Sequence, residues 1–259
     1  MSEANEPDFD ALSVTEARQL VTDGVIEGEE WVEYVEREKV LEEKHVFNQE
    51  APGEPITDDV LAEGADRADS WLSYNKGLQN KGYSPAERIT PDNVDQLEQE
   101  YTIETDTGGM QTHPVVAPGD PPVMYFTDME DTVTAANART GDVFWEHSPE
   151  VQREEFTEYA VTNRSRGVGI WEDRVFVGTN DGYMVALDRH SGDELWRTDL
   201  LWEEDLPEGM EEYPQTVTAV TAEPVAYDGI LFTGSTTDQV QWGAVHALDA
   251  ETGEKLWSE

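Results

Sequence analysis

An eleven-residue motif occurs three times in the second half of the chain. The copies are AANARTGDVFW (135–145), ALDRHSGDELW (186–196) and ALDAETGEKLW (247–257). Each copy begins with a small residue, has Thr or Ser followed by Gly at positions six and seven, and ends with Trp at position eleven. The Trp residues lie at 145, 196 and 257, so successive copies are 51 and 61 residues apart. This spacing suits one four-stranded propeller blade for each copy, with loop insertions.

The residues before each copy predict a β-hairpin. Two runs of β-branched and aromatic residues flank a polar turn in PPVMYFTDMEDTVTAANA, EDRVFVGTNDGYMVALD and DGILFTGSTTDQVQWGAVHALD. In the second of these segments, the pair Asp181-Gly182 suits a tight turn with positive φ. The sequence therefore predicts an all-β fold, a partial β-propeller of about three to four four-stranded blades.

The Thr/Ser-Gly pair of each copy predicts the turn into the outermost strand of a blade. Gly192 and its equivalents are expected to take a backbone conformation that other residues resist. The Trp that follows is expected to pack against the next blade as a docking residue, because it combines a large apolar surface with an N–H donor. Three unrelated Trp residues in a β-sandwich core are the alternative, but that alternative leaves the fixed eleven-residue frame unexplained.

Residues 1–55 predict a small, acidic, helical N-terminal extension, and residues 56–259 form the propeller part. Ser13 and Glu16 have the spacing of a capping box, and Gly24 ends that helical run. A second helix is predicted over residues 29–46, where apolar residues recur at steps of three and four. Pro52 and Pro55 mark the boundary that follows.

The charge of the chain is strongly negative. Its 58 acidic residues exceed its 16 basic residues by 42, far beyond the net charge of roughly 2 to 8 that keeps a small domain soluble. The acidic residues are spread along the chain and Lys is scarcer than Arg. This pattern indicates a halophilic protein adapted to molar salt, where the Debye length falls to about 3 Å. An acidic surface loaded with calcium is the other interpretation.

Composition also excludes several classes of function. The scarcity of clustered Lys and Arg argues against a nucleic-acid partner. With no Cys, the chain has no disulfide, thiolate metal site or Cys nucleophile. The five His residues show no paired metal spacing. No apolar run approaches the roughly 18 residues of a membrane span, and the first residues, MSEANEPDFD, show no export signal.

Residues 56–103 resemble the leading segment of quinoprotein alcohol dehydrogenases, the family that uses pyrroloquinoline quinone (PQQ). The matching residues are Trp71, Leu72, Tyr74, the triplet Tyr83-Ser84-Pro85, Ile89, Asn93, Val94 and Leu97. The three repeats are similar to that family's tryptophan-docking motifs. The resemblance implies an eight-bladed propeller that holds PQQ on a calcium ion near its axis, of which this chain supplies the N-terminal part.

The resemblance also implies cofactor-binding residues. Gln111, in GGMQTHPVV, occupies the place of a family Glu that bonds the quinone; its amide still donates and accepts but lacks the charge. Arg166, in NRSRGVGIW, matches an Arg that contacts the quinone oxygens. A guanidinium suits that place because negative charge develops on those oxygens during reduction. The adjacent Cys pair that many members carry just upstream is missing.

Two further stretches complete the implied site. Thr221, in TAEP, matches a Thr that contacts a PQQ carboxylate. The stretch STTD matches a family Ser-Gly-Ala-Glu stretch, so Ser235, Thr236 and Thr237 are candidate cofactor contacts and Asp238 is the candidate Ca²⁺ ligand. Each of these residues also has an ordinary structural interpretation: Arg166 in an ion pair between blades, Thr221 and Ser235 bonded to strand ends, and Asp238 as a solvated turn carboxylate.

The resemblance implies oxidation of an alcohol by hydride transfer to PQQ, with an Asp base and an Asn calcium ligand in blades beyond residue 259. No catalytic residue is therefore expected in this chain, which is predicted to be inactive alone and to need a chain supplying the remaining blades, an alcohol and an electron acceptor. A scaffold propeller without enzymatic activity and a PQQ-binding module are the alternatives. Family members act outside the cytoplasmic membrane.

Overall fold

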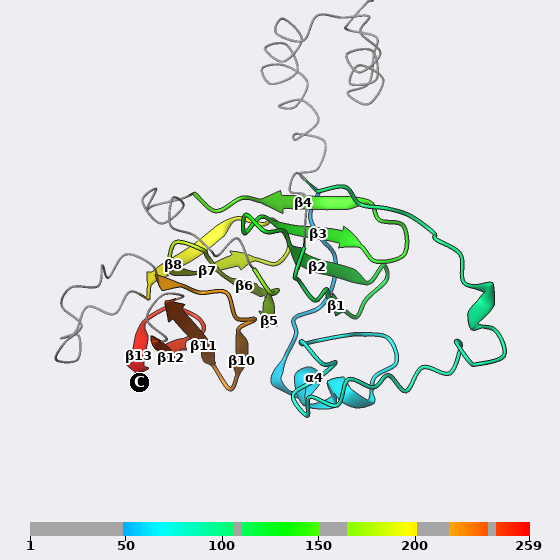
Figure 1. The fold of residues 1–259 in the computed structure, drawn as a ribbon, viewed down its shortest axis with the longest axis horizontal. Coiled ribbons are helices and arrows are strands. Elements are labelled where there is room, and N and C mark those ends of the chain that lie inside the picture. The colour runs from blue at the N-terminus through cyan, green and yellow to red at the C-terminus, as the bar shows by residue number, and fades with distance from the viewer. Residues whose placement is uncertain (1–48, 106–109, 151–164, 201–217, 238–241) are drawn as a thin grey trace, which may run out of the picture. The chain divides into compact units, whose positions relative to one another are not determined.

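The structure of the protein is a computed structural model that describes residues 49–105, 110–150, 165–200, 218–237 and 242–259 (Figure 1). All of these belong to one compact unit, Gln49–Glu259. The helices predicted within residues 1–55 lie outside the described residues. In the part of the chain that is described, no helix has the length and apolarity to cross a membrane.

Three antiparallel sheets follow one another along the chain, as the partial propeller predicts (Figure 1). The first sheet contains β1 (Val115–Ala117), β2 (Val123–Thr127), β3 (Val133–Asn137) and β4 (Val143–His147). The second contains β5 (Gly169–Trp171), β6 (Arg174–Gly178), β7 (Tyr183–Asp188) and β8 (Glu194–Asp199). The third contains β10 (Val225–Tyr227), β11 (Ile230–Thr237), β12 (Trp242–Asp249) and β13 (Lys255–Ser258), and the short β9 (Thr218–Ala219) also pairs with β11.

Each predicted hairpin is present, as β2–β3, β6–β7 and β11–β12. The turn before each outermost strand is also the same in the three sheets. Gly141, Gly192 and Gly253 have φ of 80°, 78° and 75°, a conformation that residues with a side chain adopt at a cost. The same β-bulge follows the first residue of each motif, between Ala135 and Ala136 in the first sheet and at the matching places in the others. The motif thus encodes one local structure three times.

Aromatic residues cover these glycine turns. A methyl group at Gly192 would lie 2.7 Å from two ring atoms of Trp145, and one at Gly253 would lie 2.6 Å from Trp196. The Trp145 indole N–H also donates to the Arg189 carbonyl at 3.1 Å. In contrast, the indole N–H of Trp196 has no partner among the described residues. The Trp of one sheet therefore rests on the glycine turn of the next.

Tyr101 fills the same place on the first sheet. A methyl group at Gly141 would lie 2.5 Å from its ring, and its hydroxyl donates to the Ala138 carbonyl at 2.8 Å. Ala138 and Arg189 are the fourth residues of their motif copies. Tyr101 comes from the leading segment, so this segment supplies the aromatic residue that a preceding sheet would otherwise supply.

The leading segment also lines the core. The helix α4 (Asp58–Glu63) begins at Thr57, whose hydroxyl accepts the Val60 N–H, and Asp58 and Asp59 lie in its first turn. The 3₁₀ turn η3 (Gly64–Asp66) follows it, and a second, η4 (Val94–Gln96), lies further along. Ala51, just before this segment, and Ile56, Leu61 and Leu72 within it pack into one buried cluster with the first two sheets. A second cluster lies between the second and third sheets.

Arg189 joins three parts of the fold. Its guanidinium is fully buried; it donates to the Glu54 carbonyl at 2.7 Å and to the Tyr125 hydroxyl at 3.4 Å, and it lies 3.7 Å from an Asp173 carboxylate oxygen. Its carbonyl accepts the Trp145 N–H. Arg189 therefore connects Glu54, just before the leading segment, with the first sheet and the second sheet.

An equivalent aromatic pair lies in each sheet. Tyr125 and Trp145 form it in the first, with ring centroids 6.0 Å apart, and Phe176 and Trp196 in the second, at 5.8 Å. Tyr125, Trp145 and Phe176 are at most 1% exposed because the following sheet covers them. The third pair, Phe232 and Trp257, has centroids 6.2 Å apart, but these residues are 39% and 45% exposed. We call Phe232, Val245 and Trp257 the open face of the third sheet.

Candidate functional site

The inner edges of the three sheets meet through backbone hydrogen bonds. The His113 N–H donates to the Arg166 carbonyl at 3.2 Å, and the Arg166 N–H donates to the Thr221 carbonyl at 3.2 Å. These three residues precede β1, β5 and β10, whose labels lie toward the middle of Figure 1, whereas β4, β8 and β13 lie outside. We call the region of His113, Arg166 and Thr221 the hub. Residues far apart in sequence converge there because each blade begins at its innermost strand.

Two of the predicted cofactor residues contact each other at the hub. Nη1 of Arg166 donates to the Thr221 hydroxyl and lies 3.5 Å from the Thr221 carbonyl oxygen. Arg166 is exposed and Thr221 is buried. Since a guanidinium has five N–H donors, this contact leaves others available to a ligand.

Gln111 lies beside this pair in the chain. It is exposed and is followed by Thr112, whose hydroxyl accepts the Thr127 N–H at 3.3 Å. Gln111 is two residues before His113, whose N–H donates to the Arg166 carbonyl. It therefore precedes the hub directly in the chain. The structure thus brings Arg166 and Thr221 into contact and leaves Gln111 two residues from the hub along the chain.

The stretch after Gly234 lies one strand further out. Thr236 is exposed and its backbone pairs with Ala219, two residues before Thr221. Ser235 is buried, and its hydroxyl lies 2.8 Å from Nε2 of His246. The backbone of Thr237 pairs with Thr218. Asp238, the predicted calcium ligand, lies outside the described residues. Within those residues no group of three or more His, Asp and Glu side chains could hold a metal ion.

Glu223 is a hub residue that the sequence reasoning passed over. Both carboxyl oxygens are buried without a hydrogen-bond partner among the described residues, and Oε2 would lie 3.3 Å from a methyl group at Gly167. Burial raises the pKa of Glu223 to about 8, although the nearby Tyr74 N–H opposes this shift. The side chain is thus protonated and neutral at pH 7. Glu223 is the third residue of the TAEP stretch that contains Thr221, and this position in the sequence could have marked it as a hub residue.

His113 contributes a second unpaired group. Its Nδ1 is buried without a partner in the described part of the chain, and its ring lies edge-on to Tyr74 with centroids 4.2 Å apart. Gly167 forms a parallel bridge with His113, and a methyl group on it would lie 3.2 Å from the His113 carbonyl oxygen. Glycine therefore suits this close approach, which its φ of 138° also favours.

The donors around the hub suit an anionic ligand rich in oxygen. A guanidinium, an amide and hydroxyl groups all donate hydrogen bonds, and the nearest buried carboxyl, that of Glu223, is neutral at pH 7 and does not repel an anion. PQQ carries three carboxylates and an o-quinone, so the residues present fit it.

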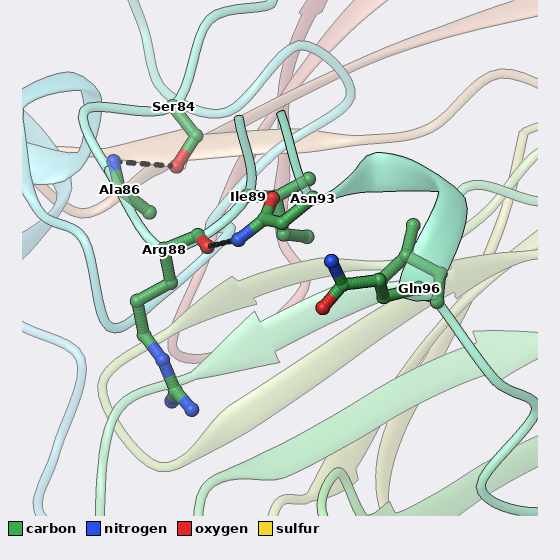
Figure 2. Close-up of a pocket in the computed structure, with 7 residues that line it drawn as sticks. Ser84, Ala86, Arg88, Ile89, Asn93 and Gln96 are labelled. Carbon is green, nitrogen blue, oxygen red and sulfur yellow. Dashed lines mark hydrogen bonds between the residues drawn. The ribbon is translucent and has the colours of Figure 1, made fainter. Parts of the chain in front are cut away.

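A surface pocket of about 690 Å³ lies elsewhere, in the leading segment (Figure 2). It is lined by Ser84, Ala86, Arg88, Ile89, Asn93, Gln96 and Leu97. The Asn93 amide donates to the Arg88 carbonyl at 2.9 Å and fixes the loop. None of the predicted cofactor residues lines this pocket, and Ile89 and Leu97 are both 61% exposed on its walls. It is therefore a depression in an uncovered surface.

Comparison with known proteins identifies relatives. The dehydrogenase subunit of alcohol dehydrogenase (quinone) from Acetobacter aceti is 31% identical over 209 residues, which are 80% of this chain and 27% of that protein. Quinohemoprotein alcohol dehydrogenase ADH-IIG from Pseudomonas putida is 28% identical over 73% of this chain and 25% of its own length. The chain thus spans about a quarter of the length of these relatives.

Solved structures agree with this relationship. The structure of the Pseudomonas putida ADH-IIG enzyme matches 80% of this chain and 29% of its own, with a TM-score of 0.68 and 27% identity. Quinohemoprotein alcohol dehydrogenase from Comamonas testosteroni matches 84% of this chain and 30% of its own, with a TM-score of 0.67 and 25% identity. The family profile for the β-propeller domain of glucose, ethanol and alcohol dehydrogenases matches residues 71–258. This chain therefore belongs to the PQQ-dependent alcohol dehydrogenase family and has that family's β-propeller fold.

Proposed function

We propose that this chain is the N-terminal part of a PQQ- and calcium-dependent quinoprotein that oxidises an alcohol. The single observation that carries the proposal is the convergence of Arg166 and Thr221, two residues matched to cofactor contacts, into one hydrogen-bonded pair at the hub. These residues come from different sheets and are 55 positions apart. The propeller arrangement of the family brings these two positions together, because they precede β5 and β10, strands of two successive sheets.

The chain's own residues bind and orient the cofactor in this proposal. When bound, PQQ supplies the quinone carbonyl that accepts hydride from the alcohol. Arg166 directs its free N–H groups at the quinone oxygens and stabilises negative charge there. The hydroxyls of Thr221 and Ser235 would donate hydrogen bonds to carboxylates of the cofactor, and the Gln111 amide would donate another. Thr236 and Thr237, the last two residues of β11, are the remaining proposed cofactor contacts.

Calcium and the catalytic base complete the proposal. Asp238 is one residue beyond β11, so its carboxylate would be the contribution of this chain to the calcium site. No side chain of this chain is assigned as the proton acceptor for the alcohol. We place that base in the remaining blades, and we expect turnover only when they are present.

The remaining blades are proposed to dock on the open face of the third sheet. The equivalent aromatic pairs of the first and second sheets are covered by the next sheet, whereas Phe232 and Trp257 are not. Val245, on the same face, is 51% exposed. A fourth sheet with the same glycine turn would cover all three residues. The exposed walls of the leading-segment pocket are a second surface for the completed ring to cover.

The test is a titration of the full chain with PQQ in the presence of Ca²⁺, read by quenching of tryptophan fluorescence. Arg166→Ala is compared with Arg139→Ala, a control in which an exposed Arg on the turn of the first motif is removed. A charge-assisted hydrogen bond contributes about 1.5 to 3 kcal/mol, so we expect Arg166→Ala to weaken binding roughly 10-fold to 150-fold. The control is expected to bind like the wild type.

Two outcomes would contradict the proposal. Equal affinities of the wild type and Arg166→Ala would remove Arg166 from the cofactor site. Failure of the wild type to bind PQQ, both alone and when supplemented with the remaining blades, would favour a scaffold propeller without enzymatic activity.

A further inference from the structure

A line of three hydrogen-bonded side chains crosses the third sheet. Ser235 on β11 lies 2.8 Å from Nε2 of His246 on β12, and Nδ1 of His246 lies 2.7 Å from the Ser258 hydroxyl on β13. The backbones of His246 and Ser258 are directly opposite each other, whereas Ser235 lies diagonally across from His246, which pairs with Thr233. The line runs from the outermost strand toward the inner strands of the sheet.

The imidazole in this line is neutral near pH 7. His246 is 1% exposed, and its burial, together with the charge of Lys255, lowers its pKa to about 4. A neutral imidazole has one N–H donor and one acceptor nitrogen, so it cannot treat its two neighbours alike. Its tautomer therefore fixes the direction of all hydrogen bonds in the line.

Two directions are available. If the Nδ1–H form prevails, the Ser258 hydroxyl accepts a hydrogen bond from Nδ1 and the Ser235 hydroxyl donates one to Nε2. If the Nε2–H form prevails, Ser258 donates to Nδ1, His246 donates to Ser235, and the proton of the Ser235 hydroxyl is free for another acceptor. The bond to His246 is the one side-chain hydrogen bond of the Ser235 hydroxyl among the described residues. Only the second direction makes Ser235 a donor to an anion.

We propose that His246, held in its Nε2–H form by Ser258, is a positioning residue that makes the Ser235 hydroxyl a hydrogen-bond donor toward an anionic carboxylate ligand at the hub. This inference rests on the proposed function, because the ligand in question is PQQ. The place of Ser235 supports it: the neighbouring Thr236 pairs with Ala219, which is two residues from Thr221 in the chain. The line thus ends one residue before Thr236, whose backbone pairs with the strand that leads to Thr221.

The first arm of the test needs no ligand. The ¹⁵N chemical shifts of the imidazole nitrogens in histidine-labelled protein report the tautomer of each of the five His residues, and His246→Gln assigns the signal. We expect the Nε2–H form in the wild type and a shift toward the Nδ1–H form in Ser258→Ala. The Nδ1–H form in the wild type, or an unchanged spectrum in Ser258→Ala, overturns the proposal.

The second arm is a PQQ titration of Ser235→Ala, Ser258→Ala and the double variant. Removal of one hydrogen bond typically changes an equilibrium about 3-fold to 10-fold, so we expect Ser235→Ala to weaken binding by that factor and Ser258→Ala by less. Because Ser258 acts through Ser235, the double variant should bind no more weakly than Ser235→Ala. Ser258→Thr, which keeps a hydroxyl, should restore binding.

Control variants and outcomes separate this proposal from the proposed function. Ser191→Ala removes an exposed hydroxyl from the turn of the second motif and should leave PQQ binding unchanged. Additive losses in the double variant overturn the role of Ser258 even when PQQ binds well. A wild type that shows the expected tautomer but binds no PQQ overturns the proposed function and the ligand assignment together.

Discussion

Two glycines with nearly the same backbone conformation separate the effect of packing at a sheet joint from the effect of backbone strain. Gly192 has φ of 78° and Gly229 has φ of 76°. A methyl group at Gly192 would lie 2.7 Å from two ring atoms of Trp145, whereas no atom of the described residues lies within 4 Å of one at Gly229. Alanine at either position takes up the same left-handed strain, but only at Gly192 does it also push against an indole ring.

The expected magnitudes follow from these two terms. Left-handed strain costs an alanine about 1 to 2 kcal/mol, and overpacking of a well-packed contact costs about 1 to 3 kcal/mol more. We therefore expect Gly229→Ala to lower the free energy of unfolding by about 1 to 2 kcal/mol, and Gly192→Ala by about 2 to 5 kcal/mol. Gly253→Ala should resemble Gly192→Ala, because its methyl group would lie 2.6 Å from Trp196.

Urea denaturation at a fixed molar salt concentration measures these differences. Urea is preferred over guanidinium chloride because guanidinium is itself a salt and would screen the charges of a chain with a net charge of −42. Equal losses of stability in Gly192→Ala and Gly229→Ala would refute the reasoning, since they would show that the indole does not press on the turn in solution.

Three further outcomes are expected from the same measurement. Trp145→Ala should cost about 3 to 5 kcal/mol, as for a buried aromatic residue, whereas Trp257→Ala, at a residue that is 45% exposed, should cost less than about 1 kcal/mol. Glu223 has a pKa of about 8 in the folded chain and about 4.5 in the unfolded chain, so the free energy of unfolding should fall as pH rises between these values. Glu223→Gln should reduce this fall, and identical pH profiles of the variant and the wild type would contradict the prediction. Stability should rise with KCl up to molar concentrations because salt screens the repulsion of 42 excess negative charges; a flat salt profile would contradict a halophilic protein.

The repeated frame was open to prediction from the sequence because local rules encode it. Alternating apolar runs, polar turns and a glycine seven residues into each motif copy predict hairpins and left-handed turns, and the structure has them at Gly141, Gly192 and Gly253. These features depend on neighbours within a few positions along the chain. One copy of the motif predicts only a hairpin and a turn, whereas three copies at similar spacing predict a β-propeller.

Residues whose role depends on distant parts of the chain were not predicted. Arg189 reads as one variable position of a motif, yet it contacts Glu54, 135 positions away, and Tyr125, 64 positions away. Tyr101 belongs to a segment matched to the family, but its place over Gly141 emerges only when the sheet is folded. The helix α4 was also missed, although Thr57 and the two Asp residues after it are a recognisable start.

The candidate site depends on the places where the three sheets differ. At equivalent scaffold positions the sheets repeat the same residue type, as in the three glycine turns and the three aromatic pairs. At the hub they do not: the chain places His113, Arg166 and Thr221 in one hydrogen-bonded series, each with different chemistry. A ring of identical sheets would present identical groups to its axis, which suits a scaffold, whereas an asymmetric ligand such as PQQ needs a different group on each side. The departure from the repeat at the hub is therefore what favours a binding site over a scaffold, and it is also why internal repetition alone could never have located Arg166.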